Sequence, residues 1–150
     1  MRESNKRILV NAGFNDAQIE ALNIVFTEQP EKADFWDSVK YFSKKEFACK
    51  CGGRYCNGYP APISENLMRV LDTIREMAGT KCIISSGLRC DTHNRNVGGV
   101  PNSWHRQGKA ADFALVGKSA KETIKYAEEF SALIIELYAI DNSYVHMAVK

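Results

Sequence analysis

Two short apolar segments each contain one polar side chain of a kind that binds metals, and they constrain the fold more than any other feature. Residues 110–115 read AADFAL, and residues 144–149 read YVHMAV. Period-two alternation predicts that both are strands, with Asp112 and His146 on the face opposite their large apolar neighbours. Burying a carboxylate in such a strand is costly unless the group is paired or bound to a metal. We therefore expect both strands to contribute to a metal site.

A third candidate ligand, His105, precedes Asp112 by seven residues, with Gly108 between them. Two imidazoles and one carboxylate, with a fourth position open to water, are a donor set of catalytic zinc sites. Such an ion lowers the pKa of its bound water to about 7 and polarises a substrate carbonyl. His105, Asp112 and His146 are thus the candidate ligands of one catalytic Zn²⁺ ion. The spacing of His105 and Asp112 alone favours surface or capping roles, and it is the apolar strands around Asp112 and His146 that favour a metal site.

The rest of the pattern predicts an α+β fold with a small, mainly antiparallel sheet flanked by helices. One helix is expected to begin after Ser64 and end at Gly79, and another to follow the capping box at Ser119. Further strands are expected at residues 82–85 and 132–139. Loops are expected where Gly, Pro, Cys and turn residues gather, at residues 43–62 and 87–104.

The 150-residue length predicts a single compact domain overall. Within it we expect an N-terminal helical segment of residues 1–42, with a helix capped by Asn15, followed by the zinc-binding domain of residues 43–150. The early apolar run at residues 8–10 is shorter than a secretory signal requires, and no segment approaches the length of a membrane span. These features predict cytoplasmic synthesis without membrane insertion.

Composition excludes few classes of partner, but the net charge argues against nucleic acid. The chain is 45% hydrophobic and 25% charged, which is ordinary for a globular protein. A formal charge of +2 is too small to indicate nucleic-acid binding. A mildly basic surface is compatible with an anionic polymer such as the bacterial cell wall. We expect a monomer.

Five cysteines form a second candidate cluster. An odd number, without an export signal, argues against a full disulfide framework. The three cysteines of the first loop could hold a structural metal if one of the two later cysteines supplied a fourth thiolate. Free, partly buried thiols are the alternative, and both interpretations stay open. The cysteines are Cys49, Cys51, Cys56, Cys82 and Cys90.

Residues 85–115, SSGLRCDTHNRNVGGVPNSWHRQGKAADFAL, contain Ser-Gly-x-Arg, His-Asn, Val-Gly-Gly and Ser-x-His-x-x-Gly-x-Ala-x-Asp in order, and a Val-His follows near the C-terminus. The pattern resembles the signature of the zinc D-Ala-D-Ala carboxypeptidase and L-alanyl-D-glutamate endopeptidase family. Its wider group includes lysostaphin-type peptidases and the hedgehog signalling domain. The resemblance covers about residues 43–150. It implies a hedgehog/DD-peptidase-like fold, zinc bound by His105, Asp112 and His146, and hydrolysis of peptidoglycan peptides.

The resemblance also implies roles around the metal. Arg89 is expected to contact the substrate or the developing oxyanion, for which a fixed guanidinium is suited. Ser103 is expected to hydrogen-bond the substrate, with a structural role in the turn as the alternative.

Two carboxylates are candidates for the general base, because this chain lacks an acid at the positions where relatives have one. Many relatives place an acid three residues before the last histidine, where this chain has Ser143, and a subgroup has one two residues after it, where this chain has Ala148. Asp141 is the nearest upstream carboxylate and is our first candidate. Glu136 is the second, because only proximity to the metal-bound water can decide between them.

The sequence thus predicts a zinc peptidase whose partner is a peptidoglycan peptide. Without an export signal, the expected setting is a phage or prophage endolysin that reaches the wall through a separate pore-forming protein. A non-catalytic zinc-containing module, for cell-wall binding or in a phage particle, is the alternative. The scissile bond, D-Ala-D-Ala or L-Ala-D-Glu, is left open.

Overall fold

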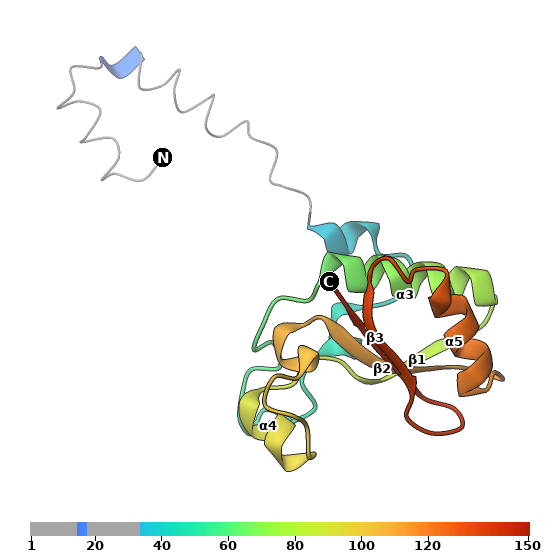
Figure 1. Ribbon diagram of the computed structural model, residues 1–150. Coiled ribbons are helices and arrows are strands. Elements are labelled where there is room, and N and C mark those ends of the chain that lie inside the picture. The colour runs from blue at the N-terminus through green and yellow to red at the C-terminus, as the bar shows by residue number, and fades with distance from the viewer. Residues whose placement is uncertain (1–14, 18–33) are drawn as a thin grey trace. The chain divides into compact units, whose positions relative to one another are not determined.

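The computed structural model describes residues 15–17 and 34–150 (Figure 1). Only residues 15–17 of the helix predicted after Asn15 are described, and most of the predicted segment 1–42 lies outside the described residues. Residues Phe35–Lys150 form one compact unit. The description below concerns this unit alone.

A four-stranded sheet forms the centre of the unit, and every neighbouring pair of strands is antiparallel. This arrangement confirms the predicted α+β class with an antiparallel sheet. In spatial order the strands are β1 (Cys82–Ser86), β2 (Ala110–Leu115), β4 (Val145–Val149) and β3 (Ile134–Ala139). The two predicted metal-binding strands, β2 and β4, are therefore neighbours in the middle of the sheet.

The helix α3 (Glu65–Ala78) covers the apolar face of the sheet. Ser64 begins it, since its hydroxyl accepts the backbone N–H of Leu67, and Gly79 ends it in the left-handed conformation, as predicted. Buried leucine and isoleucine side chains of α3 join Phe113 of β2 in one hydrophobic cluster. No helix among the described residues is both long and apolar enough to cross a membrane.

A second helix, α5 (Ala120–Glu128), packs against the same sheet. The predicted capping box is present: the Ser119 hydroxyl accepts the Glu122 backbone N–H, and the Glu122 carboxylate accepts the Ser119 backbone N–H. Figure 1 shows α3 and α5 on one side of the strands and the short helix α4 (Asp91–Asn96) on the other. The opposite face of the sheet is therefore left for a site.

The segment predicted as a loop at residues 87–104 contains a short helix, α4 (Asp91–Asn96). Its cap is Cys90, whose Sγ accepts the backbone N–H of His93. Cysteine is not among the residues that usually cap helices. The start of this helix was therefore not recognised in a segment that is rich in turn residues. A 3₁₀ turn, η3 (Trp104–Gln107), follows and leads into β2.

Candidate metal centre

The register of the sheet brings the two strand-borne candidate ligands face to face. Asp112 of β2 pairs directly with His146 of β4. The row continues to Ser86 of β1 on one side and Tyr138 of β3 on the other. Because side chains alternate along a strand, these four residues share the face opposite the helical core. His105 reaches the same place from η3, just before β2 begins.

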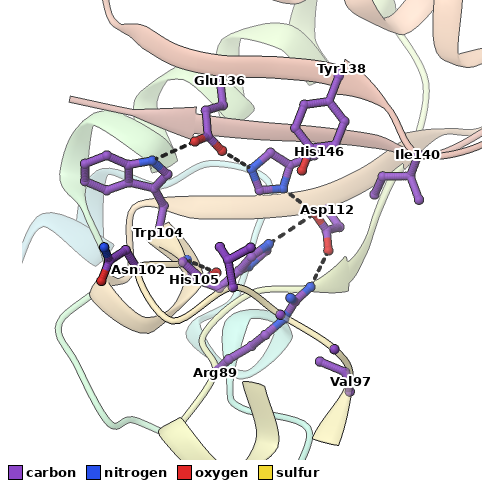
Figure 2. Close-up of a pocket in the computed structure, with 14 residues that line it drawn as sticks. Arg89, Val97, Asn102, Trp104, His105, Asp112, Glu136, Tyr138, Ile140 and His146 are labelled. Carbon is purple, nitrogen blue, oxygen red and sulfur yellow. Dashed lines mark hydrogen bonds and ion pairs between the residues drawn. The ribbon is translucent and has the colours of Figure 1, made fainter. Parts of the chain in front are cut away.

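The three candidate ligands converge on one oxygen atom (Figure 2). Oδ1 of Asp112 lies 3.1 Å from Nε2 of His105 and 2.7 Å from Nδ1 of His146. The candidate ligand atoms all lie within 4.8 Å of one another, and the three residues are buried. This is the spacing expected of donors that surround one ion.

The outer nitrogens of both imidazoles are held by groups that only accept. Nδ1 of His105 lies 2.7 Å from the carbonyl oxygen of Gly87, and Nε2 of His146 lies 3.1 Å from Oε2 of Glu136. Each outer nitrogen must therefore donate its N–H, which leaves the inner nitrogen of a neutral ring with a lone pair. Such hydrogen bonds to metal-binding histidines fix the tautomer and the ring orientation.

The chemistry of this donor set fits a cation. With the outer nitrogens protonated, His105 Nε2, His146 Nδ1 and Asp112 Oδ1 all present lone pairs to the same point. Lone pairs at hydrogen-bond distance with no proton between them repel, and a divalent ion placed among them turns that repulsion into ligation. His105, Asp112 and His146 are thus suited to hold zinc.

The second oxygen of Asp112 accepts a hydrogen bond from Arg89. Arg89 Nη2 lies 2.6 Å from Oδ2, and Arg89 Nε donates to the Ser86 hydroxyl at 2.8 Å. Burial favours the neutral carboxyl, but the neighbouring His105 and His146 and the charge of Arg89 outweigh it and hold the pKa of Asp112 well below its usual value. Asp112 is therefore an anion, as metal ligation requires.

A pocket of about 320 Å³ opens over the three candidate ligands, and Arg89 lines it as well. Its wall is partly apolar, with Val97, Val100 and Ile140. Tyr138 stacks on the ring of His146, with 4.7 Å between ring centroids and 20° between planes. The site is therefore open to a ligand on one side and enclosed by the sheet on the other.

A sequence profile of the family described as Peptidase M15 matches residues 40–148. This chain belongs to the peptidase M15 family. The family consists of zinc D-Ala-D-Ala carboxypeptidase-type enzymes, which confirms the resemblance noted from the sequence. Membership makes the chain a zinc-dependent peptidase of the kind that acts on peptidoglycan. No curated protein matches the chain.

Ser103 of this M15 peptidase lines the pocket and also caps the 3₁₀ turn that bears His105. Its hydroxyl accepts the backbone N–H of His105 at 3.3 Å and so begins η3. Ser103 also lines the pocket, although it is largely buried. The serine therefore positions a candidate ligand, and the predicted contact with substrate stays a prediction.

Asp141, the first candidate for the general base, lies in the turn between β3 and β4. Its Oδ1 accepts the backbone N–H groups of Ser143 and Tyr144, each at 2.7 Å. These two hydrogen bonds lower the pKa of Asp141. Asp141 does not line the pocket. The structure therefore brings together the three predicted ligands, Arg89 and Ser103, but not Asp141.

Glu136, the second candidate, does line the pocket. Besides its contact with His146, its Oε1 accepts the indole N–H of Trp104 at 3.1 Å (Figure 2). The Glu136 side chain is 43% exposed. It lies opposite Ala148 across the β3–β4 pair, so it occupies the neighbouring strand beside a position where some relatives have an acid.

Two aromatic residues of the pocket, Trp104 and Tyr138, were not predicted from the sequence. Trp104 occupies the variable position of the Ser-x-His pattern, and nothing local marked it. Tyr138 is two residues from Glu136 on the predicted strand 132–139, so strand alternation could have placed both on the face of the metal site.

Proposed function

We propose that this chain hydrolyses an amide bond of the peptidoglycan stem peptide, as a D-Ala-D-Ala carboxypeptidase or an L-Ala-D-Glu endopeptidase. The supporting observation is that three lone-pair donors converge in the floor of an open pocket. The carbonyl oxygen of Gly87 and the carboxylate of Glu136 set the tautomers of the two histidines. Zinc held there supplies a Lewis acid that activates water and polarises a carbonyl. An open, three-ligand set is the form that zinc catalysis uses.

Glu136 is the residue we assign as general base. Among the described residues that line the pocket, Glu136 and Asp112 are the only carboxylates. Asp112 is itself a candidate metal ligand and its side chain is only 10% exposed, whereas that of Glu136 is 43% exposed. Both oxygens of Glu136 are engaged, by Trp104 and by His146, but at 3.1 Å in a half-exposed side chain, so a water in the pocket can replace one of these contacts. Water adds across the amide: its hydroxyl goes to the carbonyl carbon, and its proton passes through Glu136 to the leaving nitrogen.

Arg89 contributes a fixed positive charge to this reaction. Its contacts with Ser86 and Asp112 hold the guanidinium at the pocket wall. A cation placed there stabilises the negative charge that develops on the carbonyl oxygen, or the carboxylate of the substrate. The apolar side chains Val97, Val100 and Ile140 would face the alanine methyl groups of a stem peptide.

Hydrolysis of purified peptidoglycan tests this proposal. Zinc-loaded protein is incubated with sacculi of several wall types, with and without chelator, beside a His105→Ala variant. We expect release of new amino groups that needs zinc and is lost in the variant. Mass spectrometry of the products identifies the bond, since free D-alanine marks a carboxypeptidase and a new D-glutamyl N-terminus marks the endopeptidase. Zinc-loaded protein that releases nothing from any wall would instead favour a non-catalytic binding module.

The phage or prophage endolysin setting stays a prediction. Co-expression of the chain with a pore-forming protein tests it: lysis of the host culture that requires both proteins, and fails with His105→Ala, supports the setting. If the pore-forming protein alone lyses the culture as fast as the two proteins together, the result contradicts the setting.

A further inference from the structure

Four of the five cysteines meet in a second cluster. The loop that follows the 3₁₀ turn η2 (Lys44–Phe47) supplies Cys49, Cys51 and Cys56, and Cys90 comes from the N-terminus of α4. Their sulfur atoms all lie within 4.8 Å of one another. Cys82, in β1, does not belong to this group.

The distances suit metal ligation better than disulfide bonds. Sulfurs bound to one tetrahedral zinc at 2.3 Å are separated by about 3.8 Å, whereas a disulfide joins them at about 2.05 Å. Sγ of Cys51 and Sγ of Cys56 are 3.6 Å apart, and all four cysteines are free thiols. Cys49, Cys51 and Cys90 are buried, so the sulfurs face one another rather than solvent.

Backbone N–H groups point at the sulfurs, as they do around metal-bound thiolates. The N–H of Cys90 donates to Cys49 at 3.3 Å, that of Gly58 to Cys56 at 3.4 Å, and that of His93 to Cys90 at 3.4 Å. Two of these donors, Cys90 and His93, belong to the start of α4, and the third, Gly58, belongs to the cysteine loop. Each adds positive potential where a thiolate would otherwise be unfavourable.

The chain between Cys51 and Cys56 is shaped to bring the two sulfurs together. Gly52 and Gly53 adopt φ values of +65° and +77° within this stretch, and Gly58, two residues after Cys56, adopts one of +95°. Glycine reaches this left-handed region without steric cost, which permits the tight turn.

We propose that Cys49, Cys51, Cys56 and Cys90 bind a second zinc ion, which is structural. Four protein ligands close the coordination sphere and leave no position for water, so this site stabilises the fold and does not catalyse. The structure thereby selects Cys90 over Cys82 as the fourth thiolate. The proposal is independent of the peptidase activity.

A metal bound by the four cysteines would hold in place the segment that supports the first metal centre. Beside it, the backbone N–H of Leu88 donates to Phe47 O at 2.8 Å, so the cysteine loop runs alongside the segment that bears Gly87 and Arg89. Gly87 holds the ring of His105, and Arg89 holds Asp112. A metal that joins Cys49 to Cys90 therefore holds both supporting residues in place.

Metal content of the full chain, purified under reducing conditions with zinc supplied, tests the proposal. We expect two zinc ions per wild-type chain and one in His105→Ala, which keeps all four thiolates. Cobalt substituted into His105→Ala should show strong sulfur-to-cobalt charge-transfer absorption in the near ultraviolet. Cys82→Ala is the matched control, a buried cysteine outside the cluster, and should retain two ions, whereas Cys90→Ala should lose one.

The His105→Ala result does not require any cysteine variant to fold. A His105→Ala protein that is folded by circular dichroism but holds no metal overturns the proposal. So does a wild-type protein whose cluster cysteines are found as disulfides after denaturation and alkylation. A loss of zinc from Cys82→Ala equal to that from Cys90→Ala would also contradict it.

Discussion

Oε2 of Glu136 lies 3.1 Å from Nε2 of His146, and Glu136 pairs across the strands with Ala148. Residues 146 and 148 share one face of β4, so Glu136 approaches the metal site from the adjacent strand. An acid at position 148 would approach it from β4 itself. Glu136 thus lies beside the position on the last strand at which a subgroup of relatives has an acid.

Glu136→Gln should lower kcat by about 10²–10⁴-fold, the usual contribution of a general base. Asp141→Asn should keep nearly full activity, because its carboxylate serves the turn and does not line the pocket. Steady-state hydrolysis of peptidoglycan fragments compares the two. Zinc content is measured in parallel, since a Glu136 that only orients His146 would weaken zinc binding and leave the kcat of the zinc-loaded variant unchanged. Full activity of zinc-saturated Glu136→Gln would exclude it as base.

Arg89→Met should destabilise the metal-free protein by about 3–5 kcal/mol, because it leaves the buried Asp112 without its cationic partner. The two side chains are only 15% and 10% exposed. Arg106→Met is the matched control, since Arg106 pairs with an exposed Asp91, and a surface pair is worth about 0–1 kcal/mol. Chemical denaturation in the presence of chelator measures both. Equal losses in the two variants would contradict the buried-pair interpretation.

Asp141→Ala should destabilise the protein at neutral pH, and the difference from wild type should shrink as the pH falls below about 4. The backbone N–H groups of Tyr144 and Ser143 lower the pKa of Asp141 in the folded state. A depressed carboxyl pKa stabilises the fold above the unfolded pKa, and this stabilisation is lost as the pH falls through the folded pKa. Thermal unfolding at several pH values measures the difference. A constant difference from pH 7 to pH 3 would show that the charge plays no part.

Gly108→Ala should destabilise the protein more than Gly117→Ala, although both glycines have similar positive φ values, +70° and +76°. A Cβ at Gly108 would meet the carbonyl oxygen of Pro62 at 1.9 Å, whereas a Cβ at Gly117 meets nothing within 4 Å. Gly117→Ala should therefore show only the cost of the left-handed conformation, about 1–2 kcal/mol. Gly108→Ala should add a displacement of the turn between His105 and Asp112, with weaker zinc binding. Denaturation midpoints and zinc affinity check both, and equal effects would contradict the clash.

Local pattern was enough to predict most of the elements. Alternation placed Asp112 and His146 on the polar face of their strands, and the caps at Ser64 and Ser119 began helices where expected. These features depend on residues a few positions apart, whose relative directions are set by the backbone itself. The helix α4 was not predicted, because its cap is Cys90, a residue that caps a helix only when the surrounding conformation allows it.

What the sequence by itself determined was the donor set: two histidines and an aspartate with an ordered motif around them. Only the tertiary structure decided which groups serve that set. It placed Glu136 rather than Asp141 at the pocket, joined Arg89 to Asp112, and brought Cys90 rather than Cys82 to the other thiols. The physical reason is that these choices depend on strand register and on the packing of distant loops. Strand register and loop packing produce no periodic pattern in the sequence, because register is set by the whole buried face and by the turns that join the strands.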